Sequence, residues 1–259
     1  GAFDLATELS TGPLAPLLAG FGVAQVDGRA TFAGRLRGRF DDPGLQGRLA
    51  VQQLQLYGLS LGRLDGELAL QRGQLALRGV RSQGSWGAVE LDGQLGLWQG
   101  SVDHPYVDPP LRVGGRLEEL DLAALLPAAL RGRGKVGAEL KAQGSLARLQ
   151  ADLAVKSGQV ELRGLGLEYV ELQARLVRNG EVLGVEVPRL ALALLGGGGL
   201  EASGELRGDR TFVLDLRAEG LPVAEIDRLS GLGRGLSGRI TLGLHGEGPL
   251  LAPRVSGDV

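Results

Sequence analysis

Apolar and polar residues alternate strictly in a block that occurs three times along the chain. The copies read GRATFAGRLRG at residues 28–38, GKVGAELKAQG at 134–144 and GRITLGLHGEG at 238–248. Successive side chains of a β-strand point to opposite faces, so a period of two residues indicates a strand. Each copy therefore predicts a strand with one apolar and one polar face.

The sequence around each block repeats as well. A second alternating segment follows each block after a turn, and a short apolar, Ala/Leu-rich stretch precedes it, beginning at Pro13, Asp121 and Pro222. Asp121 is a candidate N-cap for a helical turn that Pro127 should end. The blocks lie 106 and 104 residues apart. Such a period predicts repeat units that bury their apolar faces against their neighbours.

The stretches between the blocks read as further strands. Breaks such as Arg72-Gly73 separate alternating segments roughly every 8–12 residues, as in an antiparallel meander, here of about fifteen or more strands. The phase shift at Gln52-Gln53 predicts a β-bulge or a strand end. We expect one continuous, elongated β domain made of repeat units at residues 1–105, 106–220 and 221–259. We also expect the chain to be a fragment of a longer protein, because the third copy stops in mid-strand.

The composition bears on what covers the apolar face of such a sheet. Apolar residues are 43% of the chain, but aromatics are 4% and 45 residues are Gly. A second sheet, a curl of the sheet onto itself, or a ligand could cover the face. Filled β-sandwich cores usually contain more bulky side chains. The composition favours a sheet curled into a trough that is open to hydrocarbon, and the filled sandwich stays the alternative.

Charge and cysteine content exclude several classes of protein. The chain has no Cys and two His, which excludes a disulfide framework and a thiolate metal site. The net charge is −2, so the charge balance gives no basic surface for nucleic acid. The apolar fraction is too high for a disordered tail. No apolar run approaches the ~18 residues of a membrane-spanning helix.

The repeated phrase resembles a known family. Residues 238–259, and next residues 28–49, are similar to the TamB branch of the AsmA-like proteins, although the second copy has Ala147 in place of the turn proline. The resemblance implies a long sheet folded lengthwise, a β-taco, in the periplasm of a cell envelope. It also implies an inner-membrane anchor through an N-terminal helix outside this chain, phospholipid transport along an apolar groove, and an outer-membrane barrel protein as partner.

The expectation is a non-enzymatic segment of an envelope-spanning protein, with a role in outer-membrane biogenesis. Its groove would contact phospholipid acyl chains and it would need no cofactor or metal. The alternative is a structural scaffold that interacts with barrel-assembly partners. The predicted lining residues are Ala30, Phe32, Leu36, Leu49, Val51, Leu68, Leu70, Val136, Ala138, Leu140, Leu153, Val155, Ile240, Leu242 and Leu244.

Three motifs could carry chemistry, and each has a plainer interpretation. Residues 132–137 match G-x-G-x-x-G and residues 58–62 match G-x-S-x-G, but both run into alternating segments where a nucleotide site or a nucleophile elbow requires a helix. Asp103, His104 and Asp108 could hold a cation, yet their Pro-rich segment is better read as a linker.

Three further segments are interpreted as structural. The arginines at 29, 35, 37 and 39 could meet lipid headgroups or an acidic partner, but they are interpreted as a solvated row. Gly196 to Gly199 predicts a hinge, a bulge or a close backbone contact. The short apolar helix at Leu122–Leu130 could touch a membrane, but it is expected to pack as a plug against the sheet.

Overall fold

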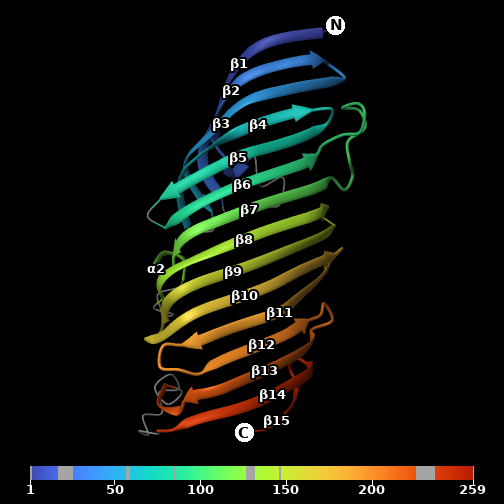
Figure 1. Ribbon diagram of the computed structural model, residues 1–259. Coiled ribbons are helices and arrows are strands. Elements are labelled where there is room, and N and C mark those ends of the chain that lie inside the picture. Colours follow the sequence, from blue (N-terminus) through green and yellow to red (C-terminus); the bar gives the residue numbers. More distant parts are fainter. Residues whose placement is uncertain are drawn as a thin grey trace. The chain divides into compact units, whose positions relative to one another are not determined.

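The computed structural model describes residues 2–16, 26–56, 59–84, 86–126, 132–145, 147–225 and 237–258. It is all-β, as predicted, with fifteen strands in one antiparallel sheet that is not closed. The strands follow one another in the sheet in chain order (Figure 1). The predicted long meander is therefore confirmed.

The elements are long for a β-protein, where strands usually have about five or six residues. The strands are β1 (Ala2–Pro13), β2 (Val26–Arg39), β3 (Asp42–Leu56), β4 (Leu59–Gln71), β5 (Gln74–Gly84), β6 (Gly87–Gly96), β7 (Pro110–Asp121), β8 (Arg133–Ser145), β9 (Arg148–Leu162), β10 (Leu165–Asn179), β11 (Val182–Leu194), β12 (Gly199–Leu206), β13 (Thr211–Pro222), β14 (Arg239–Pro249) and β15 (Arg254–Asp258). The helix α2 spans Leu122–Leu125.

The chain divides into two compact units, which are described separately below. Unit 1 comprises Gly1–Glu119 and Lys141–Leu146, and thus β1–β6, nearly all of β7 and the end of β8. Unit 2 comprises Leu120–Leu140 and Ala147–Val259, and thus the last two residues of β7, α2, the start of β8 and β9–β15. This division falls near residue 120, and the repeat boundaries expected at 105 and 220 stay a prediction.

The three sequence blocks are equivalent strands six positions apart. They form β2, β8 and β14, each followed by the predicted second strand, β3, β9 or β15. The first glycine of each block has a φ of +145°, +109° and +119°, and the last has +123°, +129° and +109°. Residues other than glycine rarely adopt a positive φ of this size. Glycine at the two ends of the block is therefore a backbone requirement of the repeat.

The helical stretch before the second block is present and short. α2 begins after Asp121, whose carboxylate accepts a hydrogen bond of 2.9 Å from the Ala123 amide, and it ends at Leu125, with Leu126 as the C-cap. The N-cap prediction is thus confirmed. The stretches expected to begin at Pro13 and Pro222 lie mostly outside the described residues.

Alternation sets the two faces of the sheet as predicted. In β2, Ala30 and Phe32 are buried while the four arginines on the other parity are exposed. The predicted bulge in β3 is also present, since Gln53 has a φ of 54° and the register with β4 shifts between Val51 and Leu54. We call the two sides the apolar face and the polar face.

Candidate functional site

A row of leucines crosses all seven strands of β1–β7 on the apolar face of unit 1. Each leucine is the register partner of the next, so that they lie side by side across the strands. The leucine row consists of Leu5, Leu36, Leu45, Leu70, Leu75, Leu95 and Leu111. Leu5 is 56% exposed and the other six are half-buried. Neighbouring strands lie ~4.8 Å apart, so the row is a continuous apolar surface ~29 Å long.

A second strip of the same face is packed. Phe32 is 6% exposed, and its ring lies over Gly34 and Gly47, where an added Cβ would come within 2.6 and 2.7 Å of the ring. Val80 covers Gly66 in the same way, since a Cβ there would lie 2.6 Å from Val80. Glycines thus leave space for large side chains of the same strand or of the neighbouring strand. The apolar face of unit 1 therefore has a packed strip and a half-exposed leucine row.

In unit 2 a core cluster occupies one end of the apolar face. Leu122 of α2 packs with Val160, Leu167 and Leu194 from three successive strands, and Leu167 is only 2% exposed. The predicted plug is thus confirmed for Leu122, whereas residues 127–130 lie outside the described part. Elsewhere on this face Leu206, Leu214 and Leu244 are 36–41% exposed. Unit 2 is therefore packed at α2 and partly open beyond it.

The polar face carries rows of alternating charge. In unit 2, Arg175 of β10 lies 2.7 Å from Asp152 of β9 and 3.5 Å from Glu186 of β11. In unit 1, Arg81 lies 2.7 Å from Glu90, and the register continues the row to Asp65 and Arg116. The hydrogen bond that the Arg175 guanidinium donates to Asp152 raises the pKa of Arg175. Opposite charges in neighbouring strands favour this register over a slipped one.

The arginine row of β2 lies on this polar face, and all four of its members are exposed. Arg39 is bound to Asp41 through two contacts of 2.9 Å. The Arg39 guanidinium lowers the pKa of the Asp41 carboxyl. This arrangement agrees with the solvated-row interpretation.

The structure separates the predicted lining residues into three groups. Ala30, Phe32 and Val51 are buried at 6–7% exposure and pack within the face. Leu244 is exposed at 41%. The remaining eleven are half-buried, namely Leu36, Leu49, Leu68, Leu70, Val136, Ala138, Leu140, Leu153, Val155, Ile240 and Leu242.

Sequence reasoning did not identify most of the leucine row. Its unpredicted members are Leu5, Leu45, Leu75, Leu95 and Leu111. Their alternation was visible, but alignment across strands depends on register, which the turns and bulges set. The short turn between Gln71 and Gln74, which fixes Leu70 opposite Leu75, is the signal that could have located the row.

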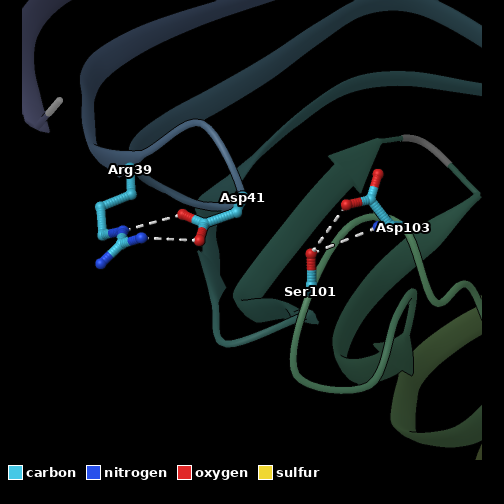
Figure 2. A network of polar contacts seen from close by, with 4 residues as sticks. All are labelled: Arg39, Asp41, Ser101 and Asp103. Carbon is cyan, nitrogen blue, oxygen red and sulfur yellow. Dashed lines mark hydrogen bonds and ion pairs between the residues drawn. The ribbon is translucent and has the colours of Figure 1, made fainter.

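The segment expected to be a linker is instead a folded loop of unit 1. Residues 97–109 join β6 to β7, and the Val102 amide donates a hydrogen bond of 3.1 Å to the Asp41 carbonyl in the β2–β3 turn. Figure 2 shows the polar contacts on either side of this link, Arg39 with Asp41 and Ser101 with Asp103. Asp108 contacts Ser145. Trp98 and Pro105 pair within the loop. The Pro-rich, non-repetitive segment therefore forms an ordered loop with defined contacts.

The other candidate motifs lie in strands. The G-x-G-x-x-G stretch enters β8 and Ser60 lies in β4, so neither meets the helix that its chemistry needs. Among the described residues no group of three His, Cys, Asp or Glu is arranged to hold a metal ion. Arg239 donates to the carbonyls of Gly196 and Gly220, both at 3.1 Å. At Gly198 a Cβ would lie 2.4 Å from the Gly220 oxygen, so the glycine run makes the close backbone contact.

Comparisons with known proteins add no family. No protein-family model matches the sequence, and neither a curated protein nor a solved structure matches the chain. In the described part of the chain, no helix is long and apolar enough to cross a membrane.

Proposed function

We propose that this chain is a non-enzymatic segment of an envelope-spanning protein that carries phospholipid acyl chains along its apolar face between inner and outer membrane. The observation that supports this most is the leucine row, a continuous apolar surface that the described chain leaves half-exposed. Burial of each acyl CH₂ contributes ~0.8 kcal/mol, so a guest chain would gain by covering the row.

The proposed mechanism is passive. The leucines repeat the same side chain at every strand, so successive positions along the row offer an acyl chain nearly equal contacts. A chain that moves from one strand to the next then gains or loses little free energy. The packed strip with Phe32 and Val80 would form a wall beside this path.

The test is native mass spectrometry with lipid extraction on the chain purified without detergent, for wild type and Leu95→Glu. Leu95 lies within the leucine row, between Leu75 and Leu111, and a carboxylate there would have to be desolvated under an acyl chain. We expect phospholipid to co-purify with wild type and to fall at least roughly tenfold in Leu95→Glu.

The matched control is Gln94→Glu, which places the same side chain one residue earlier on the polar face. It should keep the lipid load of wild type, and circular dichroism should show both variants folded. A folded, lipid-free wild-type protein would reject the transport proposal. That result would favour the scaffold alternative, in which the β-array interacts with an outer-membrane barrel partner.

A further inference from the structure

Four apolar residues stand exposed at one end of unit 1. Phe40 lies in the β2–β3 turn and is 81% exposed, and Val107 in the β6–β7 loop is fully exposed at 103%. Val102 and Tyr106 of the same loop are 36% and 37% exposed. We call these four residues the tip cluster. Single exposed apolar side chains are common, but four on two linked connections form an apolar patch.

The tip cluster is held in place by contacts beneath it. The Val102 amide is bound to the Asp41 carbonyl, which joins the loop to the turn at the residue after Phe40. Ser101 and Asp103, which flank Val102 in the chain, are hydrogen-bonded to each other (Figure 2). Arg39 and Asp41, which flank Phe40, are hydrogen-bonded to each other in the same way. The Phe40 ring packs against Phe3 with centroids 5.2 Å apart. The Phe40 side chain and the backbone at Val102 therefore need little further ordering on contact, which lowers the entropy cost of binding.

The cluster adjoins the leucine row. Leu36 and Leu45 flank the β2–β3 turn on its two strands, and Leu95 and Leu111 flank the β6–β7 loop in the same way. The tip cluster and these four leucines of the row thus lie toward the same ends of the strands. An acyl chain that leaves a bilayer at the tips would reach the row without crossing the polar face.

We propose that the tip cluster docks unit 1 on a phospholipid surface, so that acyl chains pass between the bilayer and the leucine row at this end of the strands. The choice of a lipid occupant rests on the proposed function. Phe and Tyr suit the bilayer interface, where an apolar ring meets a polar layer. Arg39 is already bound to Asp41, so apolar insertion rather than attraction to anionic headgroups drives the contact.

The experiment is flotation of the full chain with vesicles of phosphatidylcholine alone, at low and high salt. Wild type should float at both salt concentrations, and Phe40→Ser/Val107→Ser should reduce the bound fraction roughly tenfold or more, because two exposed side chains no longer insert. The control Val182→Ser changes a 56% exposed valine in unit 2 and should bind like wild type.

Insertion can be observed directly because the chain has no cysteine. An environment-sensitive fluorophore on Val107→Cys should shift to the blue with the vesicles, while the same label on Val182→Cys should not. Wild type that does not float, a double variant that floats equally well, or flotation that needs anionic lipid and is lost at high salt would each overturn the proposal. Lipid co-purification is measured separately, so failure of docking and failure of the transport proposal are distinguishable.

Discussion

At the scale of single residues, glycine on the apolar face supplies space. Gly47 faces Gly34 across the β2–β3 pair, and the Phe32 ring lies over both. One aromatic side chain thus covers parts of two strands, so a face poor in bulky residues can still have a packed strip. This role differs from that of the glycines at the block ends, where the backbone conformation is the requirement.

We expect Gly47→Ala to destabilise unit 1 by about 1–3 kcal/mol. The new Cβ would lie 2.3 Å from the Ala33 carbonyl oxygen and 2.5 Å from the Gly34 Cα, and neither backbone atom can move without disturbing the strand pair. Urea unfolding followed by circular dichroism measures the change. Gly114→Ala is the matched control, because a Cβ there meets nothing within 4 Å. Equal stabilities of the two variants would show that the space over Gly47 is not tightly filled.

At the scale of elements, side chains on both faces of the sheet connect neighbouring strands. His245 of β14 lies opposite Asp215 of β13, with 2.7 Å between the His245 Nδ1 and the Asp215 Oδ1, and Glu247 lies 3.9 Å from its Nε2. The hydrogen bond with Asp215 raises the pKa of His245 above its ordinary 6.5, against the opposing effect of desolvation. Protonated His245 therefore strengthens the β13–β14 pair.

The sign of the pH dependence follows from the raised pKa. The stabilisation by His245 is fully present below the unfolded value of about 6.5 and is lost as the pH rises through the folded pKa. We expect wild type to have a higher melting temperature than His245→Gln at about pH 6. This difference in melting temperature should be smaller at about pH 8.5. His104→Gln controls for loss of the other imidazole. A melting difference that grows with pH would contradict the assignment.

At the scale of the whole molecule, the chain exposes more surface than a compact monomer of the same mass. Its accessible surface is 16,511 Å², against about 10,800 Å² for a compact monomer of 27.0 kDa. Folding then removes about 58% of the surface of the unfolded chain, where about 72% would be usual.

We expect the heat capacity change of unfolding to lie about a fifth below the usual 12–15 cal/mol/K per residue, because it follows the area exposed. Scanning calorimetry measures it for both units together, whether or not they unfold in one step. Lipid must be extracted first, since a bound chain would add apolar area. A value in the usual range would mean that the apolar face is covered in solution.

The all-β class, the strand pattern, the repeated blocks, the bulge at Gln53 and the cap at Asp121 could all be predicted from sequence, because each depends on local periodicity or local backbone preference. The leucine row, the packing of Phe32 over two glycines and the fold of the loop at 97–109 could not. These features depend on which residues face one another across strands that are separate in sequence. Register is a long-range property. A shift of two residues keeps every side chain on its face, so alternation alone does not distinguish between such registers.

The six-strand repeat also bears on how such a chain can change in length. Six is an even number, so a complete repeat returns the chain to the same direction in the antiparallel sheet. Gain or loss of a whole repeat would therefore keep every apolar residue on its face and every helical stretch at its own end of the strands. Duplication in steps of about 105 residues is thus structurally neutral. Evolution could adjust the length of the array without redesigning its surface.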